Sequence, residues 1–111
     1  MKSVRVYLGH IRDEINFVLH ATGSLSYQQF MQDETLKRAC VRSLEIIGEA
    51  AKNLPQDYKK KHRQIEWKQL AGLRDKLIHH YFGVDIDKVW LTAKDDLPVL
   101  KTEVQKALAR I

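Results

Sequence analysis

The chain has 111 residues, of which 44% are hydrophobic and 30% are charged. This length and composition predict one folded domain, residues 1–111, because domains commonly contain about 100–150 residues and disordered chains are poorer in apolar side chains. A single cysteine, Cys40, excludes an internal disulfide framework and a thiolate zinc site. No apolar stretch suits a signal peptide or a membrane span, so we expect a cytoplasmic protein.

The net charge of +5 is concentrated in the second half of the chain. Residues 1–55 contain seven basic and six acidic residues, whereas residues 56–111 contain twelve and eight. The densest basic run is Lys59-Lys60-Lys61-His62-Arg63. Lysine and arginine displace counterions from nucleic acid, so this excess favours a phosphate-bearing partner. A solvated basic loop explains the same run equally well, and both interpretations stay open.

The spacing of apolar residues predicts two helices in the first half of the chain. One is expected over residues 4–21, before a break at Thr22-Gly23-Ser24. Asp33 is the predicted N-cap of the second helix, and Pro55 should close it. Apolar positions recur at steps of three and four in each helix: Val4, Leu8, Ile11, Ile15 and Val18, then Leu36, Cys40, Leu44, Ile47, Ala51 and Leu54.

Two more helices are expected after a polar connection over residues 55–64. The third should stop around Gly83, and its apolar stripe is Trp67, Leu70, Leu73 and Leu77. Asp85 is the predicted N-cap of the fourth helix, and Pro98 should kink that helix or divide it. The stripe of the fourth helix is Ile86, Val89, Trp90, Ala93, Leu97, Leu100, Val104 and Leu108.

No segment alternates between polar and apolar residues for long enough to predict a strand. Four amphipathic helices joined by short loops bury their apolar stripes most simply against one another. The sequence therefore predicts an all-α fold, an antiparallel four-helix bundle. A core of this size buries a modest fraction of the surface, which favours oligomerisation.

Most residues that could carry chemistry have a structural explanation. Cys40 lies on an apolar stripe and is expected in the core. Asp95 and Asp96 fit a helix start or a solvated turn before Pro98. Metalloprotease, phosphate-loop and serine-hydrolase motifs are absent from the sequence, so we expect no metal and no cofactor. Three histidines lack partners at ligand spacing and are expected at the surface or its boundary: His10, His20 and His62.

The segment 72–83 is different, because a permanent cation, two imidazoles and a phenol lie within eight residues. Arg74 can hold two phosphate oxygens through its planar guanidinium. His79 or His80 can transfer protons near neutral pH. These groups suit RNA cleavage without a metal. In that reaction the ribose 2′-hydroxyl attacks the adjacent phosphate, a base removes its proton, and the cation stabilises the anionic centre.

Helix geometry constrains how these groups can meet. Asp75 and His79 (i, i+4) share one face, and so do Arg74 and Tyr81 (i, i+7). Arg74 and His79 lie about 140° apart on an ideal helix, so they converge only if the helix loosens or a second subunit supplies half of the site. Asp75 could then hold His79 in one tautomer. The alternative is a polar helix end where histidines meet the negative end of the dipole.

The pattern Arg74-x4-His79-x-Tyr81 resembles the R-x4-H-x-Y signature of HepT-like toxins, which belong to the HEPN superfamily of helical ribonucleases. The resemblance extends from about Val4 to Leu108. It implies a metal-independent endoribonuclease toxin that works as a homodimer or multimer of dimers. We expect Arg74 and His79 to be catalytic in this chain, with Asp75 and His80 in supporting positions. Further segments also look like this family: Ile46-Ile47-Gly48-Glu49-Ala50-Ala51, Trp67 and Val89-Trp90.

The resemblance also implies a partner and a modification. The usual partner is a minimal, MntA-like nucleotidyltransferase antitoxin, which uses ATP to add AMP to the motif tyrosine, here Tyr81. The modification adds bulk and negative charge where RNA phosphates should bind. Alternatives remain: Tyr81 as a packing aromatic, a non-catalytic module that binds a nucleotide, RNA or the nucleotidyltransferase, and a purely structural adaptor.

Overall fold

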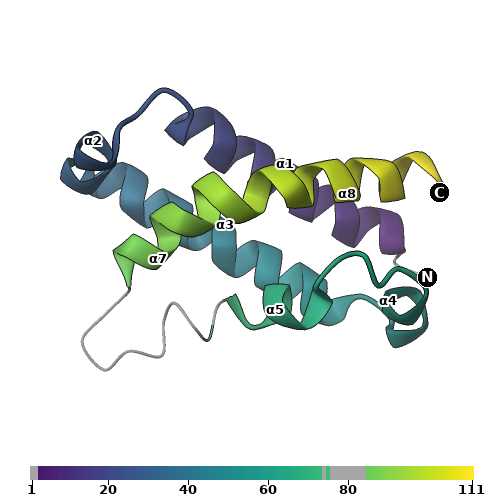
Figure 1. Cartoon of the computed structure of the whole chain (residues 1–111). Helices are drawn as coiled ribbons and strands as arrows, with labels where there is room; N and C mark the ends of the chain where they lie inside the picture. The colour runs from purple at the N-terminus through teal and green to yellow at the C-terminus, as the bar shows by residue number, and fades with distance from the viewer. Residues whose placement is uncertain (1–2, 74, 76–84) are drawn as a thin grey trace.

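Figure 1 shows the computed structural model, which describes residues 3–73, 75 and 85–111. Within these residues all regular structure is helical, and the expectation of an all-α fold is confirmed. A π-helical turn, η1 (Thr92–Asp96), joins α7 to α8. The helices are α1 (Val4–Thr22), α2 (Tyr27–Gln32), α3 (Glu34–Asn53), α4 (Gln56–Lys61), α5 (Trp67–Ala71), α7 (Ile86–Leu91) and α8 (Leu97–Ala109).

The long helices form a bundle in which successive rods run in alternating directions. α1 packs against α3 and α8, and α5 lies on α3 (Figure 1). α3 is therefore covered by helices on two of its sides, whereas α5 and α8 approach each other without extensive contact. This arrangement confirms the predicted HEPN-like antiparallel bundle.

Two side-chain caps that the sequence predicts are confirmed. The Asp33 carboxylate accepts a hydrogen bond from the Leu36 amide (2.9 Å) at the start of α3. Asp85 accepts one from the Lys88 amide (3.1 Å) at the start of α7. Each bond satisfies an amide that has no partner inside its helix. These caps fix where α3 and α7 begin.

Two short helices were not predicted. Residues 25–32, between the predicted break at Thr22-Gly23-Ser24 and Asp33, belong to no predicted helix and contain α2, which begins with a capping box. The Ser26 hydroxyl accepts from the Gln29 amide, and the Gln29 side chain accepts from the Ser26 amide. Residues 55–64, expected as a connection, contain α4 directly after Pro55. The fixed φ of proline suits a helix start, so the prediction of a plain connection is wrong for residues 56–61.

Of the two outcomes predicted for the fourth helix, a kink or a division, the structure shows a division. It begins upstream of Pro98, at η1. Proline has no amide hydrogen, and its ring disturbs the i→i−4 pattern in the preceding turn. The Leu97 amide donates instead to the Thr92 carbonyl five residues earlier, which produces η1. Pro98 itself lies in the first turn of α8, where a missing donor costs little.

The core consists of apolar side chains from every long helix, and the predicted stripes supply most of it. Cys40 is fully buried, and burial raises the pKa of its thiol to about 11. The thiol is therefore protonated at neutral pH and packs as a small apolar group, as predicted. The largest fully buried side chains are Phe30, Leu8, Ile11, Ile15, Leu44, Ile47, Leu97, Val18, Val89, Val104 and Thr22.

The position of Ile47 leads to a stability prediction. Its side chain on α3 is fully buried, so Ile47→Ala leaves a cavity and should lower the free energy of unfolding by about 2–5 kcal/mol. Val6→Ala is the matched control, because Val6 is 44% exposed on α1 and its change should stay within about 0.5 kcal/mol. Urea unfolding at one protein concentration measures both. Equal losses in the two variants would contradict the assigned core.

Candidate functional site

The structure describes one of the five predicted site residues. Asp75 is exposed just beyond α5. The predicted catalytic pair Arg74 and His79, together with His80 and Tyr81, lies outside the described residues. The same holds for the end of the third predicted helix around Gly83. The elements that lead into this segment and out of it, α5 and α7, lie within the described residues.

The chain that leads into the segment is fixed to the core. The Trp67 indole N–H donates to the His62 carbonyl (2.9 Å), and the Trp67 ring meets the edge of Tyr58 with centroids 6.2 Å apart. At the other end of α5, Leu73 is only 7% exposed. Because Leu73 immediately precedes Arg74, the backbone is held by burial one residue before the predicted phosphate ligand.

The chain that leads out of the segment is fixed by an aromatic cluster between α2 and α7. Trp90 packs against Phe30 (centroids 5.1 Å apart) and against the edge of Tyr27 (6.0 Å). The Tyr27 hydroxyl donates to the Asp87 carboxylate, and this hydrogen bond raises the pKa of Tyr27. Asp85 caps the same helix. The first turn of α7 is therefore anchored immediately after residue 84.

A second contact ties this cluster to α1. The Lys94 ammonium lies 4.7 Å from the centroid of the Trp90 ring and donates to the Thr22 carbonyl (2.7 Å). The cation thus joins the π face of an indole to the C-terminal end of α1. The periodicity of a sequence does not reveal contacts of this kind, since Thr22 and Lys94 are 72 residues apart.

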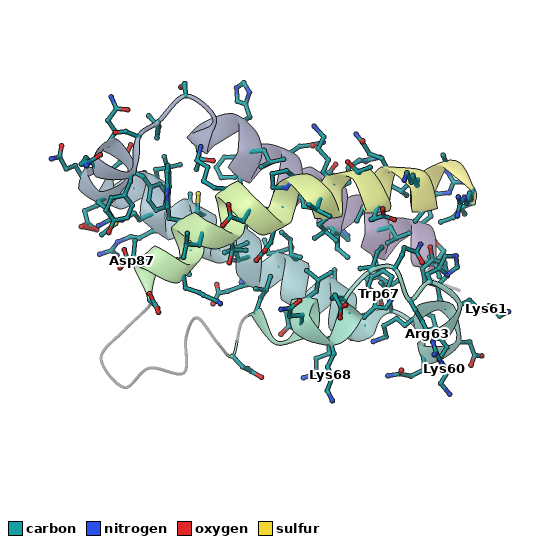
Figure 2. The ribbon with its side chains drawn as sticks, in the orientation of Figure 1. Lys60, Lys61, Arg63, Trp67, Lys68 and Asp87 are labelled. Carbon is teal, nitrogen blue, oxygen red and sulfur yellow. The ribbon has the colours of Figure 1, made fainter. Side chains whose placement is uncertain are left out.

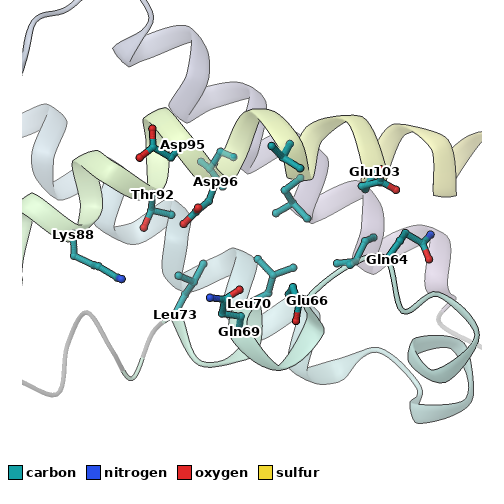
Figure 3. A pocket seen from close by; sticks show the side chains of 14 residues that line it. Gln64, Glu66, Gln69, Leu70, Leu73, Lys88, Thr92, Asp95, Asp96 and Glu103 are labelled. Carbon is teal, nitrogen blue, oxygen red and sulfur yellow. The ribbon is translucent and has the colours of Figure 1, made fainter.

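A groove of about 240 Å³ lies between α5 and the η1–α8 rod (Figure 3). Its floor is apolar and includes Leu70, Leu73 and Leu97. The Thr92 hydroxyl is buried in its wall, with no hydrogen-bond partner in the part of the chain that the structure describes. Four carboxylates and one lysine line the groove among its polar residues: Glu66, Asp95, Asp96, Glu103 and Lys88. One residue that lines the groove, Leu73, immediately precedes Arg74 in the sequence.

Other expected positions agree with the structure. Asp95 and Asp96 are exposed at the end of η1, and Asp96 immediately precedes α8, which agrees with the predicted helix start. His10 and His20 are exposed. His62 is half-buried, its ring stacks on Tyr58 at 4.0 Å, and its Nδ1 lies 2.8 Å from the Tyr58 carbonyl oxygen. All three histidines therefore occupy surface or boundary positions.

Within residues 3–73, 75 and 85–111, no group of three histidine, cysteine or acidic side chains is arranged to hold a metal ion. None of the helices described in the structure is both long and apolar enough to cross a membrane. The described surroundings of the segment therefore consist of an apolar, acid-lined groove on one side and an anchored aromatic cluster at its exit.

Comparison with known proteins identifies the family. The family described as Ribonuclease HepT-like matches residues 11–107. The chain belongs to the HepT-like ribonuclease family. The match covers the whole segment 72–83, and the resemblance that the sequence motif indicates is confirmed at the level of the family.

Individual relatives agree with this assignment. A protein of Caldanaerobacter subterraneus subsp. tengcongensis, named as a candidate RNase, is 46% identical over 110 residues, 99% of this chain and 98% of its own. One from Thermococcus cleftensis, named as a candidate ribonuclease HepT, is 43% identical over 95% of this chain and 96% of its own. A Methanocaldococcus jannaschii protein, named as a candidate RNase, is 41% identical over 99% and 91%. No solved structure gives a significant match.

Proposed function

We propose that the chain is a metal-independent endoribonuclease toxin in which Arg74 holds the scissile phosphate and His79 transfers protons. The observation that carries the proposal is the family match over residues 11–107, which includes the complete R-x4-H-x-Y pattern. Two relatives that are named as candidate ribonucleases align with nearly the full length of this chain. RNA is therefore the proposed substrate.

The proposed reaction needs only groups of the chain and of the substrate. His79 removes the proton of a ribose 2′-hydroxyl, whose oxygen attacks the neighbouring phosphorus while the bond to the 5′-oxygen breaks. A protonated group, His79 of a second copy or His80, returns a proton to the leaving 5′-oxygen. Arg74 stabilises the negative charge on the non-bridging oxygens. The products are a 2′,3′-cyclic phosphate and a 5′-hydroxyl, and Asp75 orients the imidazole.

The site also motivates a proposal about assembly. Arg74 and His79 diverge by about 140° on an ideal helix, so two copies related by a two-fold axis can together complete each site. The apolar floor of the groove between α5 and α8, next to Arg74 in sequence, offers surface for such a contact. We therefore propose a homodimer, or a multimer of dimers, with the third or fourth helix at the interface.

Control by a nucleotidyltransferase partner is the second part of the proposal. An MntA-like antitoxin would transfer AMP from ATP to the Tyr81 hydroxyl, which forms a phosphodiester and releases pyrophosphate. The added phosphate could pair with Arg74 and occupy the position of the RNA phosphate. Both ATP and RNA are cytoplasmic, so this proposal places the system in the cytoplasm. The alternative function is a non-catalytic module that binds RNA, a nucleotide or the nucleotidyltransferase, and the basic excess fits it as well.

The first functional prediction tests proton transfer. His79→Ala should slow cleavage of a labelled RNA roughly 10²- to 10⁴-fold, because removal of one acid/base group commonly costs that much. His20→Ala is the control, since His20 is exposed on α1, and it should keep the rate of the unchanged protein. Circular dichroism should show that both variants fold. Unchanged cleavage by His79→Ala would refute this role and direct attention to His80.

The second prediction concerns the oligomer. Static light scattering should give a mass of twice 13.0 kDa, or a multiple of that dimer. The reason is that, in the proposed site, Arg74 and His79 from two copies of the chain act together. The measurement is made at the protein concentration used for cleavage. An active species with the mass of a single chain would contradict the shared site.

The third prediction concerns Tyr81. Incubation with an MntA-like partner, ATP and magnesium should increase the mass of the protein by one or more AMP units and abolish cleavage. Tyr81→Phe should escape modification and stay toxic beside the partner, whereas the control Tyr7→Phe should be modified and silenced. Intact-mass spectrometry with peptide mapping locates the adduct. An adduct on Tyr7, Tyr27 or Tyr58 would show that the mechanism is wrong.

A further inference from the structure

Four basic side chains form a surface that the proposed chemistry does not use: Lys60, Lys61, Arg63 and Lys68, here called the α4 patch. All four are exposed, and none forms an ion pair with a carboxylate in the part of the chain described by the structure. Figure 2 shows three of them around α4 and Lys68 pointing away from the bundle on α5. The patch therefore presents four cations to solvent without a direct ion pair among the described residues.

The backbone beneath the patch is held firmly. The Lys59 ammonium donates to the Ala51 carbonyl (3.1 Å) in α3, which ties α4 to the centre of the bundle. His62 stacks on Tyr58, and its carbonyl accepts the indole hydrogen bond of Trp67, which is itself buried. These contacts distinguish the segment from the solvated loop that the sequence left open. Three of the four cations extend from this anchored helix and the turn after it, and Lys68 extends from α5.

Some cations elsewhere on the surface are paired, whereas the exposed Lys52, Lys88 and Arg110 also form no ion pair with a described carboxylate. The α4 patch differs from these because its four unpaired cations lie within nine residues of the chain. Arg12 pairs with Asp13 (3.1 Å), Arg42 with Glu45 (3.6 Å) and Lys106 with Glu103 (3.7 Å). The groove between α5 and the η1–α8 rod carries four carboxylates against one lysine, Lys88. The α4 patch should therefore attract a polyanion more strongly than the groove does.

The patch lies close to the proposed active segment along the chain. Lys68 precedes Arg74 by six residues, and six residues span at most about 22 Å even when fully extended. An RNA strand with its scissile phosphate at Arg74 can therefore place neighbouring phosphates over Lys68 and then over α4. Lysine and arginine bind such phosphates without reading base sequence.

We propose that the α4 patch binds the RNA backbone beside the cleaved bond and so sets the affinity for substrate rather than the rate of chemistry. The inference rests on the proposed ribonuclease function, and it adds a second region of contact for the RNA. Each phosphate neutralised on a single strand releases counterions, which makes binding depend on salt with a slope of about −0.7 in log K against log salt.

The test is a triple variant, Lys60→Gln, Lys61→Gln and Arg63→Gln, compared with the unchanged protein on a labelled single-stranded RNA. The KM should rise roughly 10- to 100-fold at about 0.1 M salt, and the salt slope of binding should fall by about 2, because three phosphate contacts are lost. The kcat should stay unchanged. The matched control is Arg12→Gln, Arg42→Gln and Lys106→Gln, which removes the same charge from cations already paired.

The outcomes separate this inference from the proposed function. Three results would overturn the inference that the α4 patch binds RNA. They are an unchanged KM and salt slope in the patch variant, a loss of kcat alone in that variant, and an equal loss of RNA affinity in the control variant. If the patch variant keeps its RNA affinity but loses a complex with the nucleotidyltransferase, the patch binds protein and the RNA assignment is wrong. If the unchanged protein binds RNA with a patch-dependent slope but cleaves none, the ribonuclease proposal fails and the patch stands.

Two single variants keep the inference testable if the triple variant does not fold. Lys60→Glu and Lys68→Glu are single changes at exposed positions, and each should weaken RNA binding while circular dichroism stays unchanged. Wild-type affinity in both folded variants would overturn the inference on its own.

Discussion

Burial of two sides of α3 is the constraint on which the other elements depend. Leu44 and Ile47 of α3 are fully buried in the core, and both α1 and α5 pack against this helix. Once α1 is seated, α8 can pack against it, and once α5 is seated, the chain before Arg74 is fixed through Leu73. The core therefore holds the backbone that leads into the proposed site, up to Leu73.

The surface around α5 divides into two regions of opposite character. On the α4 side, anchored cations face solvent without carboxylate partners among the described residues. On the α8 side, an apolar floor is bordered by carboxylates. This separation suits a protein that must bind a polyanion on one side of a helix and keep the other side for protein contact. It also gives the proposed dimer and the proposed RNA path different surfaces, so that neither excludes the other.

The long helices could be predicted because their apolar stripes extend over many turns, and the caps at Asp33 and Asp85 could be predicted because each precedes such a stripe. α2 and α4 each contain six residues, too few for a period of 3.6 to emerge from the background. The Ser26–Gln29 pair was a usable signal for α2, and Pro55 was a weaker one for α4. Pro98 predicted a division of the last helix. The division lies upstream of Pro98, in η1, because the Leu97 amide donates to the Thr92 carbonyl, and the sequence does not indicate that partner.

The candidate site also combines features that are local in the sequence with contacts between residues that are far apart in it. The motif residues are recognisable in the sequence because their chemistry and spacing are local, whereas their spatial convergence stays a prediction. The contact between Tyr27 and Asp87 joins residues 60 positions apart, and no periodicity indicates it. The groove likewise combines residues from α5, η1 and α8 that only the fold brings together.

We propose that this chain cleaves RNA through the ribose 2′-hydroxyl without a metal ion. The most direct measurement is cleavage of an end-labelled RNA by the purified protein in excess chelator, beside the same strand carrying a single 2′-deoxy substitution at the cleaved position. The first strand should be cleaved to a 2′,3′-cyclic phosphate and a 5′-hydroxyl, and the second should not be cleaved at the substituted position. Equal cleavage of both strands, or activity that disappears with the chelator, would contradict it.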